Sequence, residues 1–389
     1  MNKKWDSIEI VMLCLTFYEP PALPHDLFLA YKYITILTLF VKYCREVKSS
    51  WSVILTATMY GLVTLISTVI NAMPMNTIVA SFMYGMQIVT IFLASHRAIK
   101  RYGVNSFTDR LEHVFGCLAV LSDLLMLFIN YNFSNPSEEY LIGNKFVIAY
   151  VHCFWIALVF YKYKTIGTPL LRKGQINRKK LRYAINSVAV AILSFFICIR
   201  VTTSTGMIAV TVLFLLMIAP AKIQRILSSN YALIAVAGIM NFLNFGTAQL
   251  MTNIHVQNFI QNVLGKSATL SGRAQIWAII FGFIRRKAWL GYGYYNGVIE
   301  TYLGYGNPQN GVLKILLDTG IIGLLLYAAL IFVALQPING ENFEKKFPIL
   351  AFLYAMLVAS LVEINLTHMI VFMPLAIIAY GCERKDTNS

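Results

Sequence analysis

The residues best suited to chemistry gather in one polar, glycine-rich and basic stretch, Leu270 to Leu324, of a chain that is otherwise mostly apolar. Four cations lie close together within it, namely Arg273, Arg285, Arg286 and Lys287. Arginine and lysine bind phosphate and carboxylate groups through charge-assisted hydrogen bonds. This stretch therefore predicts a site for an anionic ligand.

A helix is predicted from Ser271 to Arg286, because apolar residues recur there at the i, i+3 and i+4 spacing of a helix. Arg273 falls in its first turn, where a cation opposes the helix dipole and adds no stability to the helix. An anionic contact is the better explanation of that arginine, and Trp277 follows one turn later on the same face. The alternative interpretation is an interfacial amphipathic helix, with Trp and Arg at the level of the lipid headgroups.

Residues 289–297 read WLGYGYYNG and are not expected to form a regular helix. Glycine permits positive φ and lets a backbone approach a ligand closely. Tyrosines such as Tyr292 offer flat amphipathic rings of the kind that stack on sugars. The sequence therefore predicts a substrate-contacting turn after the helix.

The rest of the sequence indicates an all-α, polytopic membrane protein, because 58% of it is hydrophobic and its mean hydropathy is +0.65. Apolar runs long enough to cross a hydrocarbon layer of roughly 30 Å recur throughout. Without internal repeats, residues 1–389 are expected to form a single integral membrane domain. Hydropathy predicts about twelve spans, near residues 8–22, 27–43, 51–70, 77–94, 111–129, 146–163, 183–199, 206–219, 231–250, 311–335, 347–363 and 368–382.

The net charge of +15 raises the question of a nucleic-acid partner, but the cations lie mainly in alternate connections between spans. Such an imbalance fixes membrane orientation by the positive-inside rule. Both termini are then cytoplasmic, and residues 251–310 form a long external loop that carries the candidate active site. We therefore expect no nucleic acid as a partner.

The cysteines and acidic residues predict neither a disulfide framework nor a metal site. The six cysteines show no paired spacing. The external segment contains no Asp-x-Asp or clustered His/Asp/Glu set, so arginine would replace a metal as the electrostatic partner. We expect a metal-independent protein without cofactors, with an uncleaved first span at the N-terminus.

Four short motifs in order resemble the O-antigen ligase and polysaccharide polymerase superfamily. They are Ser271-Gly272-Arg273 with Trp277, Leu290-Gly291-Tyr292-Gly293, Gln309-Asn310, and Asp318-Thr319-Gly320-Ile321-Ile322-Gly323. The layout of about twelve spans, with a long external loop before the last three, also fits that superfamily. The resemblance implies a GT-C-like membrane fold whose long external loop bears short helices.

The resemblance also implies a chemistry, in which a hydroxyl attacks a saccharide on undecaprenyl diphosphate and the lipid diphosphate leaves. Arginine stabilises the charge that develops on such a leaving group. Arg273 is the first candidate and Arg200 the second. The predicted substrate-binding set is Arg200, Arg285, Arg286, Trp277, Tyr292 and Asn310.

Gln309 departs from the family pattern, which usually has histidine there as the candidate base. Glutamine cannot accept a proton from the acceptor, so Gln309 is expected only to orient it. Glu300 is the preferred base because it lies on the external segment, with Asp318 and Glu363 as alternatives. His255 and His368, a base-free reaction, or an alignment offset by a few residues also remain open.

These observations predict a polysaccharide repeat-unit polymerase at the outer face of a bacterial cytoplasmic membrane, acting in capsule or exopolysaccharide biosynthesis. Its partners would be an undecaprenyl-diphosphate-linked oligosaccharide, the lipid bilayer and a chain-length regulator. An O-antigen-type ligase that uses the same donor is the closest alternative. A lipid-linked oligosaccharide flippase is the alternative from another class, although no paired helix breaks appear.

Overall fold

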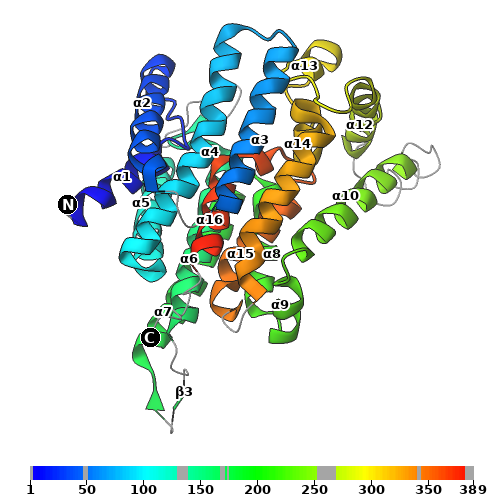
Figure 1. Cartoon of the computed structure of the whole chain (residues 1–389). Coiled ribbons are helices and arrows are strands. Elements are labelled where there is room, and N and C mark those ends of the chain that lie inside the picture. The colour runs from blue at the N-terminus through cyan, green and yellow to red at the C-terminus, as the bar shows by residue number, and fades with distance from the viewer. Residues whose placement is uncertain are drawn as a thin grey trace.

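The computed structural model describes residues 3–46, 51–128, 139–166, 171–172, 175–251, 269–339 and 343–381. Within these ranges the protein is almost entirely helical (Figure 1). The α-helices are α1 (Lys3–Leu15), α2 (His25–Tyr43), α3 (Trp51–Ile70), α4 (Met75–Tyr102), α5 (Val104–Phe128), α6 (Lys145–Thr165), α7 (Arg178–Arg200), α8 (Ser204–Ile218), α9 (Ala221–Leu227), α10 (Ala232–Met251), α12 (Thr269–Arg286), α13 (Val298–Leu303), α14 (Gly311–Leu335), α15 (Phe343–Ala359) and α16 (Phe372–Tyr380).

Short elements connect these helices. Four 3₁₀ turns are described, η1 (Cys44–Glu46), η2 (Gln336–Asn339), η3 (Asn365–Thr367) and η4 (Met369–Val371). Two antiparallel hairpins are also described, β1 (Glu139–Tyr140) with β2 (Gly143–Asn144), and β3 (Leu171–Arg172) with β4 (Gln175–Ile176). The predicted all-α class is therefore confirmed.

The centre of the bundle is built from α4, α6, α15 and α16, whose side chains are mostly buried. Helix α3 packs on both α4 and α14. At its contact with α4, Gly61 faces Gly85 so closely that a Cβ at Gly61 would lie 2.8 Å from the Gly85 Cα. This close packing fixes α3 as the support against which the outer end of α14 rests.

The number of helices that can cross a membrane is smaller than predicted. Among the described residues, six helices are long and apolar enough, or up to seven if the bent pair α8 and α9 counts as one span. Helices α1, α8, α15 and α16 have 13, 15, 17 and 9 residues, fewer than the roughly 20 that cross the hydrocarbon layer. A multi-pass membrane protein is supported, while the count of about twelve stays a prediction.

The two ends of the bundle differ in the segments that they carry. Figure 1 shows α12, α13 and the connection between α3 and α4 at the upper end, and α9 and β3 at the lower end. The upper end is the one predicted to be external. Within the predicted external loop, residues 252–268, including His255, lie outside the described residues.

The orientation can be tested with two exposed positions at opposite ends, Gly306 and Lys222. In a chain whose native cysteines are replaced by serine, we expect an impermeant maleimide to label Gly306→Cys in intact cells. Lys222→Cys should be labelled only after the membrane is opened, because the positive-inside rule puts it in the cytoplasm. Labelling of Lys222→Cys alone in intact cells would contradict this orientation.

Candidate functional site

Helix α14 is interrupted at Gly320, and the glycine-rich turn after α12 fits into the interruption. Gly320 has φ 65° and ψ −165°, which is not helical. Gly291 and Gly293 in the turn also have positive φ, of 65° and 93°. A Cβ on Gly291 would lie 2.5 Å from the Leu317 carbonyl oxygen, so only glycine permits this approach.

The turn and the helix exchange their backbone hydrogen bonds at this point. In a continuous helix the amides of Ile321 and Ile322 would donate to the carbonyls of Leu317 and Asp318. Instead, Ile321 donates to Ala288 (2.8 Å) and Ile322 to Trp289 (3.3 Å). The two freed carbonyls accept from the turn, Leu317 from Tyr292 (2.7 Å) and Asp318 from Gly293 (3.0 Å). The backbone groups released by the break are thus satisfied, as an apolar surrounding requires.

Polar side chains at the outer end of α3 hold the same junction. The Ser67 hydroxyl is hydrogen-bonded to the Leu290 carbonyl and, at 2.8 Å, to the Asp318 carbonyl. The Asn71 amide donates to Gly291 (3.1 Å), and the Tyr294 amide donates to the Thr68 hydroxyl (3.0 Å). We call residues 288–294 together with the break in α14 the backbone interlock.

The interlock changes the interpretation of the glycine motifs. The predicted purpose of the glycines was close approach to a ligand, whereas they approach the backbone of α14. The side chain of Tyr292 turns back to donate to the Phe283 carbonyl at 3.1 Å. The signature therefore builds the scaffold, and the ligand surface must come from neighbouring residues.

Two predicted substrate-binding residues are also engaged in the scaffold. Asn310 is fully buried; its side-chain oxygen caps α14, and its amide donates to Asn241 (3.0 Å) and to the Leu361 carbonyl (3.2 Å). Trp277 is only 5% exposed and donates from its indole to the Pro308 carbonyl at 3.1 Å. These bonds fix the loop between α13 and α14. Both side chains therefore point into the protein interior.

The predicted helix over 271–286 is confirmed as α12, and its buried face packs on α13 and α14 through Ile276, Ile280 and Phe283. Arg273 lies on it one turn before Trp277; its side chain is outside the described residues. Gln309 has φ 50°, and its backbone amide donates to the side-chain oxygen of Asn307 at 2.8 Å. The helix thus brings Trp277 to the loop that carries Gln309.

The other predicted residues are exposed on the outer surface of the protein. Arg285 and Arg286 are exposed at the end of α12, and the Arg286 guanidinium lies 5.8 Å from the centre of the Phe283 ring. Glu300 is exposed in the first turn of α13, and Arg200 is exposed at the end of α7. None of these four lines the cavity described next.

A cavity of about 690 Å³ opens at this outer end of the bundle. Its walls come from α2, α4, the start of α6, the outer part of α14, and the connection between α15 and α16. Tyrosines contribute much of the lining, namely Tyr18, Tyr84, Tyr150, Tyr294 and Tyr295. Flat amphipathic rings around a wide polar space suit a sugar chain.

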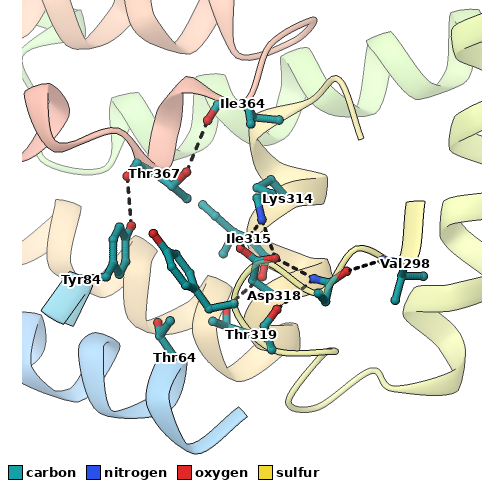
Figure 2. Close-up of polar contacts among 12 residues, drawn as sticks. Thr64, Tyr84, Val298, Lys314, Ile315, Asp318, Thr319, Ile364 and Thr367 are labelled. Carbon is teal, nitrogen blue, oxygen red and sulfur yellow. Dashed lines mark hydrogen bonds and ion pairs between the residues drawn. The ribbon is translucent and has the colours of Figure 1, made fainter. Parts of the chain in front are cut away.

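Two charged groups of the cavity, Lys314 and Asp318, lie on α14 and point toward each other, as Figure 2 shows. Both Asp318 oxygens accept from the Lys314 ammonium at 2.7 Å, and one accepts from the Asn296 amide at 2.9 Å. Asn296 in turn accepts from the Val298 amide at 3.1 Å. Asp318 is 5% exposed, so this network fixes the turn to the helix rather than leaving a free carboxylate.

The connection between α15 and α16 supplies Glu363 and His368, both half-buried and both lining the cavity. Burial lowers the pKa of His368 to about 4, and the charge of Lys32 acts in the same direction. Nδ1 of His368 accepts from the Ile370 amide at 3.3 Å, so Nε2 carries the proton of the neutral ring. His368 is therefore suited to donate a hydrogen bond and not to act as a base at neutral pH.

The sequence around this site matches a known protein family. Residues 189–328 match the family model described as O-antigen ligase. The match covers this segment only, which is similar to the O-antigen ligase family. The resemblance seen in the four motifs is thereby confirmed, and members of the family are membrane glycosyltransferase-like enzymes. No curated protein matches the chain.

The O-antigen ligase segment covers α8, α10, α12, α13 and the interlock, but only part of the cavity. Lys32, Glu363 and His368 lie outside it. The sequence patterns did not single out Lys32, nor Lys314 and Asn296 as partners of Asp318. The i, i+4 spacing of Lys314 and Asp318 was the available signal for that pair.

The interlock predicts a strong difference between two glycines. Gly320→Ala places a side chain at positive φ, a strain of about 1 to 3 kcal/mol, and its methyl group meets the Trp289 carbonyl. Gly306→Ala is the matched control, because a Cβ there meets open space. In detergent, we expect Gly320→Ala to lower Tm by roughly 5 °C or more and Gly306→Ala to leave it unchanged. Equal Tm values for the two variants would contradict the interlock.

Proposed function

We propose that this protein is a polysaccharide repeat-unit polymerase, which transfers a glycan from a lipid diphosphate to a hydroxyl of a lipid-linked repeat unit. The observation that carries the proposal is the tyrosine-lined cavity at the end of the bundle, with its wall built by the interlock of the O-antigen ligase segment. The donor is undecaprenyl-diphosphate-linked oligosaccharide, and the reaction takes place at the outer face of a bacterial cytoplasmic membrane. A chain-length regulator is the further protein partner.

Arg273 is proposed to stabilise the leaving group. When the bond from the anomeric carbon to the diphosphate oxygen breaks, the electron pair stays on the diphosphate, whose charge grows. A bidentate guanidinium stabilises that charge more in the transition state than in the ground state. Arg285 and Arg286, exposed at the far end of the same helix, are suited to attract the diphosphate headgroup.

Glu363 is proposed as the base, in place of Glu300. Glu300 is exposed on α13 and does not line the cavity, and Asp318 is only 5% exposed, with both of its oxygens accepting from Lys314. Glu363 lines the cavity from the connection between α15 and α16. It would take the proton of the acceptor hydroxyl as the oxygen bonds to the anomeric carbon, and Gln309 would only orient the acceptor.

The ligase and flippase alternatives differ in the support that they have. A ligase would use the same donor and the same residues with another acceptor, and the substituted Gln309 is the feature that favours the polymerase. A flippase has no supporting observation among the described residues. The described residues hold no group of three His, Cys, Asp or Glu suited to a metal, and metal independence stays a prediction.

The role of Arg273 can be tested in cells that depend on this protein for polymer. We expect Arg273→Ala to reduce polymer by about 10² to 10³, the range for removing one group that stabilises developing charge. Arg273→Lys should restore only part of it, because a point charge does not grip two oxygens. Membrane levels of each variant are the control. A normal amount of polymer in the Arg273→Ala variant would contradict the proposed role of Arg273 in stabilising the diphosphate.

The choice of base can be tested by comparing Glu363→Gln with Glu300→Gln in purified protein. Loss of a general base costs about 10² to 10⁴ in turnover, and we expect that loss for Glu363→Gln only. Since both substitutions preserve shape, a thermal melt should find both variants folded. A large loss in Glu300→Gln with normal turnover in Glu363→Gln would reverse the assignment.

A further inference from the structure

Lys32 is a cation that lines the cavity, and it has no role in the proposed glycosyl transfer. It lies on α2, half-buried, and lines the cavity beside Glu19 and Phe28. Figure 1 shows α2 and α12 on opposite sides of the bundle. Lys32 is therefore on the other side of the molecule from the helix that carries Arg273.

The other charged groups of the cavity each have an interaction within the protein. Asp318 is paired with Lys314 at 2.7 Å, and Glu19 is paired with His25 at 2.5 Å. Glu363 also has an interaction within the protein. In the described part of the chain no residue forms a hydrogen bond or an ion pair with Lys32, which interacts electrostatically with Glu19 over a longer distance.

A lysine in this position destabilises the protein unless its charge has a partner or binds a ligand. Lys32 stands within the mostly apolar run 27–41 and is half-buried, and a cation partly withdrawn from water without a partner is disfavoured. A hydroxyl of a sugar would be bound as well by a neutral amide, at lower desolvation cost. A full positive charge is suited to an anionic group, which it binds through up to three N–H donors.

We infer that Lys32 binds an anionic group of the glycan substrate, within the same cavity. The inference rests on the proposed function, since it takes the cavity as the glycan site. Tyr18 and Tyr150 lie against His368, with ring centres 5.8 and 6.0 Å from it, and all three line the cavity with Lys32. Together they form a pocket for an acidic sugar ring, with aromatic faces and one cation. The carboxylate of a uronic acid and the diphosphate of the donor share the required chemistry.

The test is direct binding to the purified full chain in lipid nanodiscs, followed by calorimetry. The probes are cellobiouronic acid, its neutral counterpart cellobiose, and inorganic pyrophosphate. We expect the wild type to bind cellobiouronic acid about tenfold more tightly than cellobiose, the scale of a charged hydrogen bond. Lys32→Met should remove that preference while retaining the affinity for cellobiose, and Lys32→Arg should keep most of it.

The controls separate charge at this site from charge in general. Lys222→Met removes an exposed cation at the opposite end of the bundle and should change nothing. If pyrophosphate binding depends on Lys32 and cellobiouronic acid shows no preference, the anionic group is the donor diphosphate, so the inference stands and the assignment of the diphosphate to Arg273 is contradicted. If neither anion depends on Lys32, the inference is overturned.

This readout does not depend on catalysis. A wild type that prefers the acidic probe through Lys32 but transfers no glycan would contradict the proposed function and leave the anion site intact. A polymerising enzyme whose Lys32→Met variant binds all three probes like the wild type would contradict only the anion site. Retained cellobiose binding, or an unchanged Tm, shows that Lys32→Met is folded.

Discussion

The exchange of backbone hydrogen bonds between residues 288–293 and α14 is the constraint on which the outer end of this protein depends. A helix broken at Gly320 leaves two carbonyls and two amides without helical partners, and the turn satisfies all four. Their loss in an apolar surrounding would cost several kcal/mol for each group. The turn therefore has one register, which carries Tyr294 and Tyr295 to the cavity wall and Asn296 to the Asp318 carboxylate.

The cavity is composite. The O-antigen ligase segment supplies the interlock and the α14 wall, while α2, α6 and the connection between α15 and α16 complete the site from outside that segment. The family signature thus specifies a rigid support for one wall of the cavity. Lys32 and Tyr150 are suited to select a particular glycan. Both lie on helices outside the segment that matches the family.

Much of the fold could be predicted from the sequence, because α12 follows from local periodicity and most of the apolar helices follow from hydropathy. The site could be predicted only in part. Trp277 and Asn310 read as substrate contacts, but their partners Pro308, Asn241 and Leu361 are distant in the sequence, and periodicity carries no information on such pairs. The glycines were interpreted as ligand contacts for the same reason, since the α14 backbone that they meet lies elsewhere in the chain.

The most direct test of the central claim, that this cavity performs glycosyl transfer from a lipid diphosphate, is the release of undecaprenyl diphosphate by the purified protein. With a defined lipid-linked repeat unit and excess EDTA, the account predicts one lipid diphosphate released for each glycosidic bond formed. Release should require an acceptor, since the acceptor oxygen displaces the leaving group. Release without glycan growth, or no release from any repeat unit that the protein binds, would contradict it.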